Sequence, residues 1–246
     1  MKSYDSELQY HIKMRKGDVG KYVLLPGDPG RVELIASFLD NASLVIENRE
    51  HKTYTGSLEG VAVSVTSTGI GSPSTAIAVE ELSQIGADTF IRVGTSGVIQ
   101  EHVKPGDLIV VSGAVRDEGT SLQYMPLDFP AIADLDLVHC LTEACNKTNA
   151  NYHVGLSHSK DSFYGEVEPN RMPISTTLNA KWDAWQKAGV LCSEMEASAL
   201  FIVSSILQNR AGGLMIAGGT HESLDVLCKT AVEGIRLLIA LDANKQ

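Results

Sequence analysis

The residues with the clearest chemical potential form an arginine-containing apolar run that ends in glycine. In residues 90–97 (FIRVGTSG), Arg92 stands within the apolar part, where a charged side chain is costly unless it is paired. Arg92 therefore needs an anionic partner. Residues 65–75 (VTSTGIGSPST) break into glycine and serine in the same way, and Pro73 and Ser74 signal a helix start. The two stretches predict an anion site at the carboxyl edge of a sheet, where open α/β sheets usually bind ligands.

A further glycine turn is a candidate anion cradle. An expected strand at residues 22–25 runs into the turn at 26–31 (PGDPGR), and the apolar spacing of residues 32–39 predicts a helix. Backbone N–H groups and the helix dipole favour negative charge at such a turn, with Arg31 beside it. A surface loop with a solvated Arg31 explains the segment equally well.

Two acidic residues precede an apolar helix. Glu194 and Glu196 flank Met195 directly before an apolar stretch that reaches Ile206. Acidic groups in a first helical turn usually complement the helix dipole. Because this helix is expected to be buried, its acidic entry is equally well interpreted as the lining of a cavity.

When considered alone, other polar segments are typical of loops on the protein surface. His11 lies in a polar lead-in, and residues 49–51 form a charged connector between expected strands. Residues 161–171 combine two aromatic side chains with acidic groups. This pattern is typical of a ligand-facing loop or of a surface loop anchored by its aromatic residues.

Composition limits the function classes. The 246 residues are 43% hydrophobic, and the net charge of −10 argues against a general nucleic-acid-binding surface. A small anion in a local arginine cluster is compatible with that charge. No apolar run reaches membrane-spanning length, and the first residues lack the apolar stretch of a signal peptide. The cysteines show no metal-ligand spacing, so we expect reduced thiols and a cytoplasmic protein without membrane or nucleic-acid partners.

Strands that alternate with helices predict the fold class. The alternation favours one α/β domain over residues 1–246 with a mostly parallel sheet, and closely spaced strands in residues 45–66 add an antiparallel portion. Residues 116–130 are expected to form a loop, and Trp182 and Trp185 are expected in the core. Further strands are expected at residues 89–93, 108–112, 152–157 and 213–217, and helices at 76–84, 135–147, 181–187 and 223–240.

Four motifs occur in a characteristic order and spacing, namely residues 26–31 (PGDPGR), 67–74 (STGIGSPS), 92–97 (RVGTSG) and 193–196 (SEME). They resemble the nucleoside phosphorylase-I family, and residues 161–164 (DSFY) together with the Tyr10-His11 entry look like its uridine phosphorylase branch. The resemblance extends from about His11 to Leu238. It implies an α/β domain with a central mixed, partly barrel-like sheet flanked by helices. It also implies phosphorolysis of a nucleoside to a free base and a sugar 1-phosphate, with inorganic phosphate as co-substrate and no required cofactor.

The resemblance implies a phosphate site built on arginine. Phosphate must be held beneath C1′ of the sugar, and guanidinium groups bind it bidentately while staying charged. Arg31 and Arg92 would act there as catalytic residues, and Arg49 would reach the site from a neighbouring subunit. The implied phosphate-binding set is Gly27, Arg31, Arg49, Arg92 and Thr95.

The resemblance likewise implies a nucleoside site. Glu196 would be a catalytic residue that accepts hydrogen bonds from the ribose 2′- and 3′-hydroxyls and pairs with Arg92. His11 would contact the 5′-hydroxyl from the adjacent subunit, so a homodimer that shares its active sites is implied, usually within a hexamer. The implied nucleoside-binding set comprises the sugar-lining Glu194 and Met195, the base-stacking Phe163, and His11, Thr95, Glu166, Arg171 and Glu196. A potassium ion between subunits would lie at Glu50, Ile70 and Ser74.

The base loop departs from the resembled pattern. Uridine phosphorylases usually carry glutamine where this chain has Glu166, and an arginine close behind it where this chain has Glu168, so Arg171 is the expected substitute. An ionised carboxylate can only accept hydrogen bonds, whereas uracil offers two acceptors and one donor. The N1–H of a 6-oxopurine suits a carboxylate better. The sequence therefore predicts uridine phosphorolysis, with a 6-oxopurine nucleoside phosphorylase as the alternative.

The chain is also short where family members carry a longer segment that closes over the base. That segment would lie between Gly219 and Thr220. A chain without it would shield the base poorly from water and turn over slowly. A homologue that binds nucleosides with weak or no turnover is therefore a second alternative.

Overall fold

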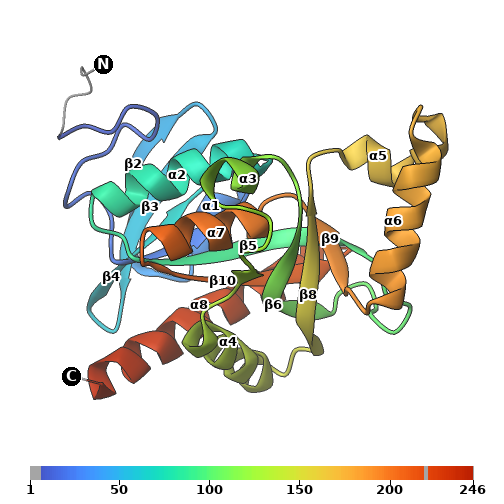
Figure 1. The fold of residues 1–246 in the computed structure, drawn as a ribbon. Helices are drawn as coiled ribbons and strands as arrows, with labels where there is room; N and C mark the ends of the chain where they lie inside the picture. Colours follow the sequence, from blue (N-terminus) through green and yellow to red (C-terminus); the bar gives the residue numbers. More distant parts are fainter. Residues whose placement is uncertain (1–6, 219–220, 246) are drawn as a thin grey trace.

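A closed ring of strands forms the centre of the molecule (Figure 1), a computed structural model that describes residues 7–218 and 221–245. In the ten-stranded sheet, the order β10-β6-β8-β9-β5 returns to β10, because β10 also pairs with β5. This confirms the expected single α/β domain with a mixed, partly barrel-like sheet. The ring strands are β5 (Thr89–Val98), β6 (Leu108–Asp117), β8 (Tyr152–Lys160), β9 (Cys192–Glu194) and β10 (Arg210–Ala217).

Further strands extend the sheet from β5. β1 pairs in parallel with both β5 and β4, whereas β2, β3 and β4 form the expected antiparallel portion. Glu59 and Gly60 join β3 to β4 with φ angles of 51° and 77°, the left-handed backbone typical of a tight hairpin turn. These strands are β1 (Tyr22–Leu25), β2 (Asp40–Asn48), β3 (His51–Leu58) and β4 (Val61–Thr66), and the short β7 (Ala131–Ile132) pairs with β6.

Helices cover both faces of the sheet. The α1, α4 and α8 helices share one apolar cluster, and α2 and α7 share another on the opposite face (Figure 1). None of the helices in the described ranges combines the length and the apolar composition needed to cross a membrane. The helices are α1 (Gly30–Ala36), α2 (Ser72–Gln84), α3 (Thr120–Tyr124), α4 (Leu135–Thr148), α5 (Phe163–Val167), α6 (Ser175–Lys187), α7 (Ala197–Ile206) and α8 (His221–Asn244), with a 3-10 turn at Pro169–Arg171.

Two segments expected as loops contain regular structure. Within residues 116–130, β6 continues to Asp117 and α3 follows, because the guanidinium of Arg116 donates hydrogen bonds to several backbone carbonyls of this segment. Residues 161–171 fold into α5 and the 3-10 turn. Ser162 caps α5 by accepting a hydrogen bond from the N–H of Gly165 at 3.0 Å.

The expectation that the tryptophans belong to the core is wrong. The α6 helix has no fully buried residue, and Trp182 and Trp185 are only partly buried. Figure 1 shows α5 and α6 standing beside the ring and away from the two helix layers. The apolar side of α6 therefore lines a cavity, described below, instead of joining the core.

Candidate active site

Arg92 and Glu196 form a buried ion pair at the centre of the candidate site. Arg92 lies on β5 and is 5% exposed, while Glu196 immediately precedes α7 and is 3% exposed. The Nη2 of Arg92 donates a hydrogen bond to Oε2 of Glu196. Glu196 is thus the anionic partner that an arginine in a core strand requires.

The turn after β1 lies beside that pair. Leu25, the last residue of β1, is in register with Arg92, so residues 26–31 begin next to the guanidinium. A Cβ at Gly27 would lie 3.1 Å from Nη1 of Arg92 and 3.1 Å from the carbonyl oxygen of Gly69. Glycine at position 27 therefore lets this turn pack closely against both the Arg92 guanidinium and the turn that contains Gly69.

Arg31 faces the same region from the start of α1. Burial and the positive charge of Arg92 lower the pKa of Arg31. The buried Nε atoms of both arginines lack a hydrogen-bond partner among the described residues. Two neighbouring guanidinium groups with uncommitted donors are suited to an anion such as phosphate, which arginine binds through paired N–H groups.

Glu196 also fixes the glycine turn before α2. Its Oε1 accepts a hydrogen bond from the backbone N–H of Gly71 at 2.7 Å. Gly69 and Gly71 have φ angles of 72° and 97°, a backbone conformation that favours glycine. The carboxylate therefore joins β5, this turn and the start of α7, which are far apart in the sequence.

Glu194 is buried, like Glu196 and Arg92, and backbone N–H groups engage its carboxylate. It is 4% exposed, and its Oε2 accepts hydrogen bonds from the backbone N–H groups of Glu196 and Ala197, each at 2.8 Å. Burial and the nearby charge of Glu196 raise the pKa of Glu194. Its carboxyl group holds the start of α7, and the partly exposed Met195 follows it; that Glu194 lines the sugar stays a prediction.

The base loop places Glu166 in a polar cluster. Its Oε2 accepts a hydrogen bond from Ser193 Oγ and forms an ion pair with Nζ of Lys160, which lies 3.0 Å away. His158 Nδ1 lies 3.6 Å from the same oxygen. Although burial opposes the change, hydrogen bonds from His158 and Ser193 and the charge of Lys160 lower the pKa of Glu166. Glu166 is therefore an ionised acceptor.

Arg171 and Phe163 lie elsewhere on this loop. Arg171 pairs with Glu168 at 2.9 Å between Nε and Oε2 on the exposed surface, and its guanidinium lies over the ring of Tyr164. It therefore does not join Glu166, and its expected role as a substitute base-binding arginine has no support in this geometry. Phe163 is 53% exposed and contacts Tyr164 edge to face.

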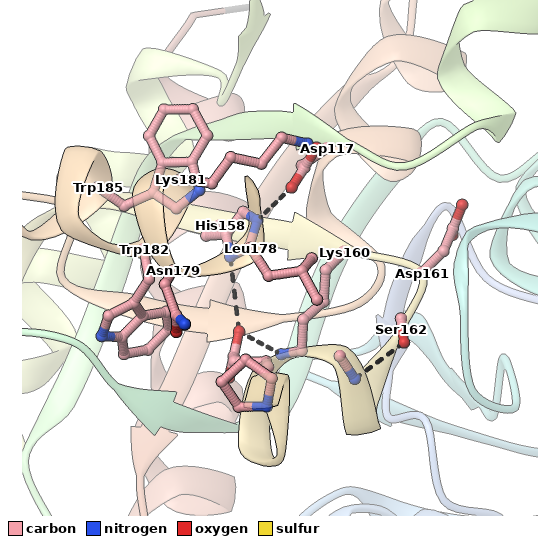
Figure 2. Close-up of a pocket in the computed structure, with 13 residues that line it drawn as sticks. Asp117, His158, Lys160, Asp161, Ser162, Leu178, Asn179, Lys181, Trp182 and Trp185 are labelled. Carbon is pink, nitrogen blue, oxygen red and sulfur yellow. Dashed lines mark hydrogen bonds and ion pairs between the residues drawn. The ribbon is translucent and has the colours of Figure 1, made fainter. Parts of the chain in front are cut away.

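A cavity of about 490 Å³ opens next to Glu166, between α6 and the ring (Figure 2). Figure 2 shows His158 and Lys160 on its strand side and Trp182 on its helix side. Sequence reasoning missed His158 and Lys160, which belong to no motif. The alternation of residues 152–160 as a strand was the available signal, because it places residues 158 and 160 on one face.

Among the described residues, His11 and Arg49, which are expected to serve a neighbouring subunit, form no hydrogen bond or ion pair with Arg92 or Glu196. His11 is anchored by Glu81, whose Oε1 lies 2.6 Å from its Nδ1. Arg49 is exposed and has a φ angle of 57°. Both are on segments beside the β2–β3 turn, since Asn48 donates a hydrogen bond to the carbonyl of His11.

The expected potassium ligands converge only in part. Glu50 Oε1 accepts a hydrogen bond from Ser74 Oγ at 2.8 Å, whereas Ile70 has only its backbone carbonyl to offer a cation and is 77% exposed. Within the described ranges, no group of at least three His, Cys, Asp or Glu residues could hold a metal ion. The expected lid position, Gly219 and Thr220, lies outside the described residues.

The chain is an α/β protein whose strand ring carries a buried arginine–glutamate pair with a second arginine beside it. A sequence model of the phosphorylase superfamily matches residues 21–233. The chain belongs to the phosphorylase superfamily, as its motifs predict.

Several relatives resemble most of the chain. A uridine phosphorylase of Treponema pallidum is 42% identical over 255 residues, which cover 98% of this chain and 98% of the relative. A uridine phosphorylase of Thermococcus kodakarensis is 50% identical over 208 residues, which cover 83% of this chain and 75% of the relative. A guanosine phosphorylase of Halorubrum lacusprofundi is 37% identical over 244 residues, which cover 96% of this chain and 97% of the relative.

Proposed function

We propose that this protein is a pentosyltransferase that converts uridine and inorganic phosphate into uracil and ribose 1-phosphate. The observation that carries the proposal is the buried Arg92–Glu196 pair with Arg31 beside it, because it offers an anion site next to a carboxylate. The uridine phosphorylases that resemble most of the chain support uridine as the nucleoside. Nucleoside and phosphate are then the two substrates, and residues 1–246 act as one phosphorylase domain.

The chemistry assigns a role to each part of the site. The bond between C1′ and the base nitrogen breaks with its electron pair moving to the base, and a phosphate oxygen bonds to C1′ through an oxocarbenium-like transition state. Arg31 and Arg92 hold the phosphate, with Gly27 and Thr95 beside it. Glu196 accepts hydrogen bonds from the ribose hydroxyls. Positioning and charge stabilisation then supply most of the acceleration.

Base identity has one specific alternative. Glu166 is held as an ionised acceptor, and the N1–H of a 6-oxopurine would suit it. The resemblance to a guanosine phosphorylase also favours this possibility. A purine nucleoside phosphorylase is therefore the second candidate function.

A nucleoside panel tests these assignments. We expect uracil release from uridine, measured by absorbance, only when phosphate is present. Inosine or guanosine cleavage without uridine cleavage would instead establish the purine function. A folded protein that releases no base from uridine, thymidine, inosine, guanosine or adenosine would contradict both and indicate a binding homologue.

We further propose a homodimer with shared sites, within a hexamer, in the cytoplasm. The partial exposure of His11 and the exposure of Arg49 support sharing, because side chains open to the surface are available to a neighbouring subunit. The unpaired, buried state of all four cysteines supports a reducing compartment. For potassium, the adjacent oxygens of Glu50 and Ser74 are suitable hard donors, and Ile70 would contribute its backbone carbonyl.

Mixing two inactive variants tests the sharing of sites. Arg49→Gln and Glu196→Gln chains, unfolded and refolded together, should regain about a quarter of the wild-type activity, because half of randomly paired twofold dimers would carry one intact site. Each variant refolded alone is the control. Mixed dimers that form, as seen by native mass spectrometry, yet remain inactive would contradict a shared site.

A further inference from the structure

The carboxylate of Glu81 on α2 holds the segment that carries His11. Glu81 is 8% exposed, and its Oε2 accepts hydrogen bonds from the backbone N–H groups of His11 and Ile12 at 2.9 and 2.8 Å. Its Oε1 lies 2.6 Å from Nδ1 of the His11 ring. A largely buried carboxylate requires such donors. One group therefore fixes both the backbone and the imidazole of His11.

The distances separate a contact with the ring from simple anchoring of the chain. Oε2 of Glu81 by itself accepts both backbone N–H groups. Oε1 lies 3.1 Å from the backbone nitrogen of His11 but 2.6 Å from its Nδ1. Oε1 is therefore engaged mainly by the imidazole, and a charged acceptor makes such a hydrogen bond stronger than a neutral one.

The contact with Glu81 also determines which nitrogen of the His11 ring carries a proton. An ionised carboxylate can only accept hydrogen bonds, so Nδ1 is the donor. In the neutral imidazole, Nε2 is then an acceptor. Nε2 has no hydrogen-bond partner within residues 7–218 and 221–245, and the side chain of His11 is 29% exposed. His11 thus offers an acceptor to a group outside the described part of its own chain.

A further hydrogen bond links His11 to the segment that presents Arg49. Nδ2 of Asn48 donates to the carbonyl oxygen of His11 at 2.6 Å, and Asn48 directly precedes Arg49. The ring of Tyr10 packs edge to face against the imidazole, with the ring centroids 4.8 Å apart. Glu81, Asn48 and Tyr10 therefore restrain a histidine whose second ring nitrogen remains available.

We propose that Glu81 is a positioning residue that presents Nε2 of His11 to the 5′-hydroxyl of the nucleoside. The 5′-hydroxyl donates a hydrogen bond to Nε2, and Glu81 acts through the imidazole without touching the substrate. The inference rests on the proposed function and its shared sites, and it assigns a determinant of specificity at the sugar end. Without the carboxylate, the ring would lose its fixed orientation and its fixed tautomer. Nucleosides with and without a 5′-hydroxyl would then become nearly equivalent.

Replacing Glu81 by methionine, which is similar in size and has no strong acceptor, tests the assignment. The measured quantity is kcat/KM for uridine divided by kcat/KM for 5′-deoxyuridine, which lacks the 5′-hydroxyl. We expect this ratio to be roughly 3 to 10 in the wild type, the worth of one hydrogen bond, and about 1 in Glu81→Met. A lower yield of folded protein cancels from the ratio, because both substrates are measured on the same preparation.

A double variant shows whether Glu81 acts through His11. His11→Ala should also bring the ratio to about 1, and adding Glu81→Met should change it no further, because residues in contact act as a unit. A loss of activity towards both substrates with the wild-type ratio intact would reveal a merely structural role and overturn the proposal. Glu80→Met is the matched control and should keep the ratio, since Glu80 lies beside Glu81 on α2 and hydrogen-bonds with Tyr124 instead.

A variant that keeps an acceptor and the wild-type enzyme complete the test. If Glu81→Met does not fold, Glu81→Gln has a single carbonyl acceptor for three N–H groups and should give an intermediate ratio. The wild-type ratio in that variant would equally overturn the proposal. A wild-type enzyme that cleaves uridine and 5′-deoxyuridine alike would overturn it too, while leaving the proposed function intact. Failure of the wild-type enzyme on every nucleoside would instead overturn the proposed function.

Discussion

Replacing Glu196 by glutamine is expected to lower kcat/KM for uridine by roughly 100- to 1,000-fold, the range observed when one preorganised electrostatic group is lost. The carboxylate is the partner of Arg92 and the acceptor for the N–H of Gly71. Glutamine retains one carbonyl acceptor but removes the charge that orients the guanidinium. The loss should appear mainly in kcat, because Arg31 and Arg92 still attract phosphate.

Steady-state kinetics and calorimetry measure the two parts of this prediction. Phosphate binding to Glu196→Gln, followed by isothermal titration, should be at least as tight as in the wild type, since a competing negative charge is gone. Glu33→Gln is the matched control, because Glu33 is an exposed carboxylate on α1. Equal loss of phosphate binding and kcat would contradict the separate roles of the arginines and the carboxylate.

Replacing Asp242 by asparagine should lower the free energy of unfolding by about 2 kcal/mol at pH 7. Asp242 on α8 accepts hydrogen bonds from both terminal nitrogens of Arg210, at 2.8 and 2.7 Å, and from the hydroxyl of Tyr22 at 2.6 Å. This network ties the last helix to β10 and β1. The hydrogen bonds from Arg210 lower the pKa of Asp242 to about 2 from its ordinary 3.8.

The sign of the pKa change fixes the pH dependence. Because the folded-state pKa is depressed, the stabilisation is fully present above about pH 4 and is lost as the pH falls towards 2. Urea unfolding at equal protein concentration should therefore show wild type and Asp242→Asn converging between pH 4 and 2. Asp225→Asn removes an exposed pair with Lys229 and should change stability by less than about 0.5 kcal/mol. If the difference in unfolding free energy between wild type and Asp242→Asn stayed constant down to pH 2, stability would not depend on the ionisation of Asp242.

Local chemistry made part of the site predictable. An arginine in an apolar strand needs an anion, and the family resemblance then named Glu196 as that partner. The glycine turn at 69–71 was recognisable because its residues favour an unusual backbone. The ring itself was expected through the family resemblance, since the pairing of β10 with β5 leaves no signature in either strand.

Other parts depended on tertiary structure. Lys160 meets Glu166 because β8, β9 and α5 come together at one corner, and a single strand does not encode that meeting. The tryptophans of α6 follow a helical apolar pattern, but the helix lies beside the ring, so its apolar side meets a cavity. Glu194 and Glu196 look equivalent in the sequence, yet the backbone turns one carboxylate towards α7 and the other towards Arg92.

The position of α5 and α6 beside the ring also bears on how such a protein can diversify. The arginine–glutamate pair is buried in strands and turns that support the whole sheet, so most substitutions there would cost stability. The α6 helix contributes no fully buried residue, and mutations along it are far less constrained. We therefore expect substitutions in this lineage to accumulate faster along α6 than around the arginine–glutamate pair.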